Sequence, residues 1–196
     1  MSGVRSRAES KVATRRALLE AGVAELVEHG LATPSLDAIC ARAGYTRGAF
    51  YVHFEDRDAF NLAVLEHVLG SFLDLIDGEG AHADDLEHTI DRFVGALSQR
   101  QLPAHSGRVI DELLQASARS PELRERFLEL HAEILARVTR ATRRGQASGK
   151  LRSDVEPSEL ATMLVALGLG VLMIRDADVP LEPDRIAAAV LRLLRA

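Results

Sequence analysis

The chain has 196 residues, a net charge of −5 and 47% hydrophobic residues, enough for one or two small domains with a real hydrophobic core. Its one cysteine cannot form an internal disulfide, and no cysteine and histidine spacing resembles a zinc site. Alanine, leucine, glutamate and arginine recur at helical spacing, which indicates an all-α fold.

The amino-terminal segment, MSGVRSRAESK, carries charges but no apolar core, so it is not typical of a secretory signal. The longest uncharged run, Leu160 to Ile174, has fifteen residues and contains Gly168 and Gly170. A membrane span needs roughly 20 residues, so we interpret this run as a buried helix. We expect a cytoplasmic protein that does not enter a membrane.

Charge is distributed unevenly along the chain. The first 54 residues carry seven basic and five acidic side chains, a net of +2, whereas the remainder carries a net of −7. A polyanion would therefore bind the amino-terminal part.

The first predicted helix covers residues 8–29 and ends before Gly30. One face of it is apolar and consists of Val12, Leu19, Val23, Leu26 and Val27. After the break at Thr33 and Pro34, Ser35 is placed to cap a second, short helix that ends at Gly44. The inward residues of this helix are Leu36, Ile39 and Cys40.

Thr46 can cap a third helix from Arg47 to about His53, and Asp56 a longer fourth helix that continues past Phe72. The sequence Asp77-Gly78-Glu79-Gly80 predicts a boundary. Beyond it, apolar spacing predicts five more helices, around 86–97, around 109–114, from 120 onward, over 157–174 and around 186–194. We expect the charged stretch 140–150 to be frayed.

Two short helices joined by a turn that contains glycine form a helix-turn-helix, whose second helix enters the DNA major groove. Gly44 supplies this turn, and Gly48 would let the backbone approach a phosphate. The second helix presents Thr46, Arg47, Tyr51 and His53 outward, whereas Phe50 and Phe54 can anchor its other side.

Residues 15–60 resemble, without a gap, the amino-terminal domain of the TetR family of transcriptional repressors. The matching residues are Arg15, Leu18, Leu19, Gly30, Ile39, Ala43, Gly44, Thr46, Arg47, Gly48, Phe50, Tyr51, Phe54, Asp56 and Arg57. Gly22 and Leu26 stand where the family more often has alanine and phenylalanine, which softens the expected packing of the first helix. Ala49 replaces a frequent hydroxyl residue, and Arg57 keeps the charge of the usual lysine.

The resemblance implies a DNA-binding domain over residues 1–55 and a ligand-binding and dimerisation domain over residues 56–196. The residues that it places against DNA are Tyr45, Thr46, Arg47, Gly48, Tyr51, His53 and Arg57. Arg47 and Tyr45 are the candidates for base reading, because arginine can pair bidentately with guanine and tyrosine can touch a thymine methyl group.

Apolar residues point in nearly every direction around the helix predicted at 157–174, and the surface of one subunit could not cover them. With the last helix they predict a four-helix interface in a homodimer; the alternative is a central helix buried within one subunit. The candidate interface residues are Leu160, Met163, Leu164, Leu167, Val171, Ile186, Val190 and Leu193. Two such DNA-binding domains predict a palindromic operator.

A ligand pocket is expected between the fourth helix and the two that follow Pro103 and Pro121. Its candidate residues are Phe72, Leu113, Leu114, Phe127, Leu130, His131 and Ile134, and ordinary core packing is the alternative for each. Because His131 is the one polar group among them, a small, mainly apolar effector fits better than a sugar or a metal. The resemblance implies that the effector tilts the fourth helix and releases the DNA.

Three other functions are weaker alternatives. A helical di-iron enzyme needs paired Glu-x-x-His motifs, whereas this chain offers only Asp85-x-x-His88, and His131 between Glu129 and Glu133 has the wrong spacing. A thiol sensor would use Cys40, whose inward position favours packing. A helical dimer without a DNA-binding role is the third. No motif for a cofactor is present, and none is expected.

Overall fold

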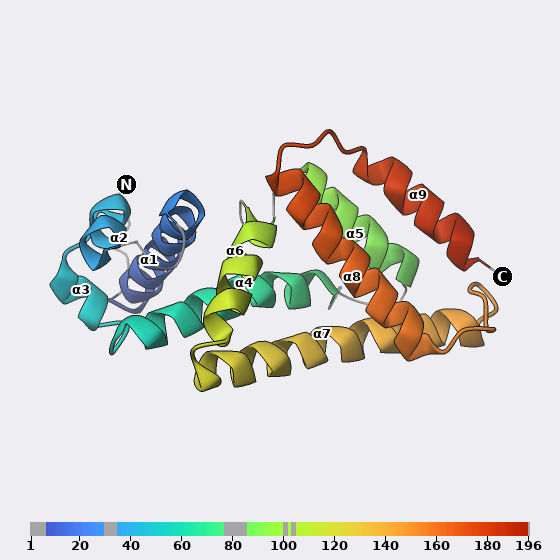
Figure 1. Ribbon diagram of the computed structural model, residues 1–196, viewed down its shortest axis with the longest axis horizontal. Helices are drawn as coiled ribbons and strands as arrows, with labels where there is room; N and C mark the ends of the chain where they lie inside the picture. The colour runs from blue at the N-terminus through green and yellow to red at the C-terminus, as the bar shows by residue number, and fades with distance from the viewer. Residues whose placement is uncertain (1–6, 30–34, 77–85, 100–101, 103–104, 196) are drawn as a thin grey trace.

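A computed structural model describes residues 7–29, 35–76, 86–99, 102 and 105–195. Within these ranges the chain folds into helices and contains no β-strand, which confirms the predicted all-α fold. In chain order the helices are α1 (Arg7–His29), α2 (Leu36–Ala43), α3 (Arg47–Tyr51), α4 (Arg57–Ile76), α5 (Leu86–Ser98), α6 (Ser106–Ser117), α7 (Pro121–Ala147), α8 (Pro157–Asp176) and α9 (Pro183–Leu194). Helix α4 leads from the group formed by α1, α2 and α3 to the remaining helices (Figure 1).

Helices α1, α2 and α3 enclose a small core that includes the fully buried side chains of Leu18 and Phe50. Helix α1 contributes the apolar stripe that its periodicity predicts, namely Leu19, Val23, Leu26 and Val27. The prediction for Val12 was wrong, because this side chain is 69% exposed. No residue from Glu9 to Arg16 is buried, so this part of α1 contributes no side chain to the core.

The turn between α2 and α3 follows the predicted pattern. Gly44 ends α2 at a φ of 73°, in the left-handed region that glycine enters without a steric penalty. The side chain of Ser35 accepts a hydrogen bond from the Ala38 amide at 3.1 Å and caps α2. Helix α3 ends at Tyr51 rather than near His53, because the His53 amide donates to the carbonyl three residues back and tightens the chain into a turn.

The ring of Phe60, in the first turn of α4, fixes that helix to α1 and α3. Its centroid lies 5.1 Å from that of Phe50 and 4.9 Å from that of Phe54. On the α1 side the ring lies directly on Gly22, where a Cβ atom would come within 2.4 Å of the Phe60 Cζ atom. Gly22 therefore does not loosen α1 as expected from the sequence, because the ring fills the space that a methyl group would occupy.

Beyond Phe60, α4 is a core helix. Val64, Leu65 and Val68 are fully buried. Two polar contacts also tie α4 to α7: Arg126 Nε lies 2.9 Å from Glu66 Oε1, and Arg137 Nη1 donates to the Leu73 carbonyl at 3.3 Å. The boundary predicted at residues 77–80 lies outside the described residues.

The charged stretch from Arg140 onward is not frayed, because α7 continues to Ala147. Ala141 and Thr142 are buried there, and the Thr142 hydroxyl donates to the Val138 carbonyl at 2.9 Å. These residues belong to a second apolar cluster, which also contains Leu151 from the loop after α7. Helix α7 ends where Gly149 takes a left-handed φ of 71° and the Lys150 amide donates back to the Gly145 carbonyl.

Helices α4 and α8 are long and apolar enough to cross a membrane by length and composition alone. In α4, 39% of the most apolar window is buried, including Val64, Leu65 and Val68. Helix α8 packs against α6 and α7, but only 22% of its most apolar window is buried. The expectation that it would be a buried helix is therefore not met by the single chain, and its exposed apolar side chains include Met163, Leu167, Met173 and Ile174.

We predict that Gly22→Ala destabilises the protein by about 1–3 kcal/mol, because the added methyl group overpacks the contact with Phe60. This loss should occur although alanine is the better helix former by about 1 kcal/mol. Urea unfolding followed by circular dichroism, at matched protein concentration, measures the change.

Gly70→Ala in α4 is the matched control, since a Cβ atom there would meet nothing within 4 Å. It should be neutral or stabilising. Combining Gly22→Ala with Phe60→Leu should cost less than the sum of the two single changes, because the smaller side chain makes room for the methyl group. Equal effects of the two glycine substitutions would contradict this account of the α1–α4 contact.

Candidate nucleic-acid interface and ligand cavity

Most of the residues singled out around α3 are exposed. Tyr45 is 36% exposed and Tyr51 is 56% exposed. The other exposed members of the predicted set are Thr46, Arg47, Gly48 and Arg57, and His53 is half-buried. On the opposite side Phe50 and Phe54 are buried. This arrangement holds a short helix by its apolar side and leaves its polar side open to a partner.

Thr46 and Gly48 have different local roles. The Thr46 side-chain oxygen accepts a hydrogen bond from the Ala49 amide at 3.3 Å and caps α3. This bond does not use the hydroxyl proton, which can be donated to another acceptor. A Cβ atom at Gly48 would meet no atom nearer than 3.7 Å, the Thr46 hydroxyl oxygen. Packing within the chain therefore does not require glycine at this position, whereas close approach of a partner would.

Two basic residues of α1, which the predicted set did not include, extend this surface. Burial lowers the pKa of His53, and the nearby charges of Lys11 and Arg15 lower it further. The Arg15 guanidinium lies 5.4 Å from the centroid of the Phe54 ring. Lys11 and Arg15 are four residues apart on one helix, and this spacing is the sequence signal that could have identified them.

Arg47 is held by an acidic residue that sequence reasoning missed. Its Nε atom lies 2.5 Å from Asp37 Oδ1, and its Nη2 atom lies 2.7 Å from Asp37 Oδ2. These hydrogen bonds, together with the charge of Asp37, raise the pKa of Arg47 above its already high value. Ten residues and a turn separate the two side chains, so no local pattern reveals the pair.

A second arginine joins α1 to α2. Arg42 Nε lies 2.6 Å from the buried carboxylate of Glu25, and Arg42 Nη2 also donates to Glu28. His29 Nδ1 lies 3.3 Å from the same Glu25 carboxylate. Glu25, Glu28 and His29 offer ligand atoms within 4.8 Å of one another, but both carboxylates already accept hydrogen bonds from the Arg42 guanidinium. We interpret the group as a clamp between helices rather than a metal site.

Cys40 is buried in α2. Burial raises the pKa of its thiol and the Asp37 carboxylate raises it further, whereas Arg47 lowers it. Arg47 is thus a basic neighbour that the sequence did not reveal, but burial is the larger effect. A thiol in this environment is a packed side chain rather than a reactive one.

Among the described residues, the groups considered for catalysis do not come together in a site. Arg126 lies 2.9 Å from Glu129, and Arg137 lies 2.5 Å from Glu133. His131 lies between these two acids in the sequence, but its ring stacks on that of Phe127, with 6.2 Å between the two ring centroids. Asp85 lies outside the described residues.

An apolar cavity of about 450 Å³, partly open to the surface, lies among helices α4 to α9. Five of the seven candidate pocket residues line it, namely Phe72, Leu114, Phe127, His131 and Ile134. Leu113 and Leu130 do not line it and are buried in the core. The polar side chains on its wall are His131, Thr89 and Thr162. A largely apolar wall with a few polar groups suits a small apolar ligand.

The cavity is wider than expected from the sequence, because α5, α8 and α9 also line it. Phe93 of α5 faces it, and its ring centroid lies 6.5 Å from that of Phe72. Five candidate interface residues are part of its wall, namely Leu164, Leu167, Val171, Ile186 and Val190. Residues on α8 and α9 can therefore contribute both to a pocket and to the surface beside it.

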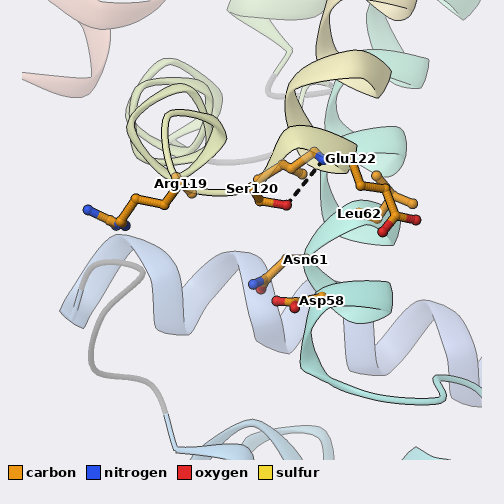
Figure 2. A pocket seen from close by; sticks show the side chains of 8 residues that line it. Asp58, Asn61, Leu62, Arg119, Ser120 and Glu122 are labelled. Atoms are coloured by element: carbon orange, nitrogen blue, oxygen red, sulfur yellow. Dashed lines mark hydrogen bonds between the residues drawn. The ribbon is translucent and has the colours of Figure 1, made fainter.

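A smaller cavity of about 240 Å³ lies between the first turns of α4 and the corner that joins α6 to α7. Figure 2 shows Asp58 and Asn61 on α4 at one side, and Ser120 and Glu122 of that corner at the other, whereas the Arg119 side chain extends away from them. The Ser120 hydroxyl oxygen accepts a hydrogen bond from the Leu123 amide at 3.3 Å, which caps α7 (Figure 2). The wall of this smaller cavity is polar, whereas that of the larger cavity is apolar.

The predicted interface residues differ in exposure. Met163 is 65%, Leu167 42% and Leu193 72% exposed. Leu164, Ile186 and Val190 are half-buried. Leu160 and Val171 are buried within the single chain, so they pack inside the subunit rather than at its surface. Exposed large apolar side chains on a soluble protein indicate a contact surface when they are contiguous.

Two family models match the chain. One, described as the tetracyclin repressor-like C-terminal domain, matches residues 76–193, more than half of the chain. The other, described as bacterial regulatory proteins of the tetR family, matches residues 18–64. The second match contains α2, α3 and the turn between them.

Among similar proteins is the HTH-type transcriptional repressor DhaR of Mycobacterium sp. (strain GP1), 24% identical, with 94% of each chain covered. The structure of SmeT from Stenotrophomonas maltophilia in complex with triclosan is 30% identical, covers 94% of this chain and 92% of that one, and superposes with a TM-score of 0.67. A putative TetR-family regulator from Rhodococcus sp., 19% identical over 93% and 99% of the two chains, has a TM-score of 0.77 and shares the fold. The chain therefore belongs to the TetR family of bacterial regulatory proteins, DNA-binding transcriptional regulators that are not enzymes.

Proposed function

We propose that this protein is a cytoplasmic repressor that binds a palindromic operator as a homodimer and is released by a small, mainly apolar effector. The observation that carries the proposal is the polar surface of α3, which stands exposed on a buried aromatic anchor. DhaR and SmeT are both named as repressors, which supports the same direction of control.

We assign DNA binding and effector binding to different parts of the chain. Residues 1–55 form the DNA-binding domain and residues 56–196 the ligand-binding and dimerisation domain, with α4 as the link. Because Glu66 and the Leu73 carbonyl of α4 are bonded to arginines of α7, a shift of α7 moves α4 with it. Phe60 then passes this movement to α1 and α3. An effector in the larger cavity touches both α4 and α7 and favours the state that does not bind DNA.

The homodimer forms through the outer faces of α8 and α9. The exposed Met163 and Leu167 of α8, with Leu193 of α9, supply the apolar centre of the contact. A twofold axis there duplicates the DNA-binding surface, and the operator then has two half-sites related by the same symmetry.

For the operator, we predict that selection from randomised duplex DNA at near-physiological salt enriches a palindrome with the unmodified protein. Arg47→Ala should weaken binding to the selected duplex by about 1–3 kcal/mol, and Tyr51→Ala should weaken it too, because each removes a group from the exposed side of α3. Arg143→Ala, which removes the same charge from the far part of α7, is the control and should bind normally. No enriched sequence at any salt concentration would rule out the proposal.

For the dimer, we predict that analytical ultracentrifugation gives twice the chain mass of 21.3 kDa. Met163→Glu should yield the monomer mass, because a carboxylate would be buried without a partner in the contact. Leu128→Glu on α7, at a side chain that is 54% exposed and outside the proposed interface, should remain dimeric. A monomeric unmodified protein would contradict the proposed interface.

For the effector, we predict that a thermal-shift panel of apolar aromatic compounds, including triclosan, raises the melting temperature, whereas sugars do not. Binding at 100 times the dissociation constant contributes about 2.7 kcal/mol, and a chain of this size shifts by about 2–4 °C per kcal/mol. Ile90→Trp, which fills the cavity, should abolish the shift, and Leu128→Trp on the surface should keep it. Equal shifts in both variants would place the ligand elsewhere.

A further inference from the structure

The exposed pair formed by Asp37 and Arg47 bridges the two helices of the helix-turn-helix. Asp37 lies in the first turn of α2, where the helix dipole favours a carboxylate, and Arg47 is the first residue of α3. The turn at Gly44 brings them together, and both oxygens of Asp37 are used, by Nε at 2.5 Å and by Nη2 at 2.7 Å.

This geometry leaves one edge of the guanidinium open. An arginine has five N–H donors, and the side-on contact with Asp37 uses the Nε proton and one Nη2 proton. The second Nη2 proton and both Nη1 protons remain, and they include the end-on pair that can reach two acceptors at once. Guanine presents such a pair of acceptors, N7 and O6, in the major groove.

The pair contributes little to the stability of the fold. The side chain of Arg47 is 58% exposed and that of Asp37 is 68% exposed, and exposed ion pairs of this kind have small net effects. What the pair does is restrict a long, flexible side chain to one orientation before any partner arrives, which lowers the entropic cost of binding. A carboxylate on a surface meant for DNA is also repelled by phosphates unless a cation neutralises it, as Arg47 does here.

We propose that Asp37 is a positioning residue that orients Arg47 to read one guanine in each half-site. The proposal rests on the proposed DNA-binding function of α3. Asp37 acts through Arg47 and does not itself contact the base. Without it, Arg47 is free to move to the nearest phosphate, so that affinity is retained while the preference for guanine is lost.

The test compares affinities by fluorescence anisotropy for the selected operator and for duplexes in which each G·C pair is replaced symmetrically by A·T. With the unmodified protein one replacement should weaken binding roughly 5–150-fold, the range expected for a bidentate arginine contact. In Asp37→Ala the same replacement should weaken binding less than about threefold, and affinity for unrelated DNA should be equal or higher because a negative charge is lost. Asp37→Asn, which keeps the side-chain size, should fall between the two.

Two further variants separate positioning from other effects. Glu55→Ala removes a negative charge from the same domain and should leave the preference for guanine intact. Arg47→Ala should lose the preference, and adding Asp37→Ala to it should change the preference no further, because both act through one contact. Circular dichroism and melting temperatures confirm that each variant is folded.

An unchanged preference for guanine in folded Asp37→Ala would overturn the inference. If that variant also bound the operator more tightly, Asp37 would instead compete with DNA for Arg47. A selected operator with no G·C pair sensitive to Arg47 would overturn it as well. These outcomes leave the proposed function standing. Failure of the unmodified protein to select any duplex would overturn both.

Discussion

The contact between the Phe60 ring and Gly22 joins the DNA-binding helices to the rest of the protein. The ring occupies the space that a side chain at Gly22 would need, and it also packs against Phe50 and Phe54. One side chain of α4 thus touches α1, α3 and the turn after α3. Because protein interiors are closely packed, α4 cannot move at this end without moving the surface that carries Arg47 and Tyr51. The other end of α4 lines the larger cavity.

Electrostatics separates the two ends of the molecule. The net charge of −5 would oppose DNA binding if it were uniformly spread, but the first 54 residues are net positive. Within this part Arg42 pairs with Glu25 and Glu28, and Arg47 pairs with Asp37. Lys11 and Arg15 add positive charge beside His53, close to α3.

The sequence predicted the features that depend on a few neighbouring residues. The caps at Ser35 and Thr46 and the turn at Gly44 are local, since each needs one residue type and the backbone two or three positions away. Contacts between distant segments were missed. Val12 matched the apolar period, but its side chain is 69% exposed. The stretch after Arg140 is charged, yet it is helical and has one buried face. Both depend on what packs against the helix.

The residues of the candidate sites were also predicted where the signal is local and missed where it depends on distant segments. The set around α3 could be named from its spacing, whereas Asp37 could not, because its partner is brought to it only by the turn. The apolar pocket was expected from α4, α6 and α7, but Phe93 on α5 and residues of α8 and α9 complete its wall. Periodicity shows which face of a helix is apolar, not which other helix it meets.

Hydrogen–deuterium exchange, followed by mass spectrometry with and without the selected operator, tests the central claim most directly. The account predicts that operator DNA slows exchange in peptides that cover residues 45–57 and the first turns of α1, and that a scrambled duplex does so much less. Exchange in α8 and α9 should be slow in both states, because the dimer contact exists without DNA. Protection confined to the helices after α4, or none around α3 with a duplex that binds, would contradict it.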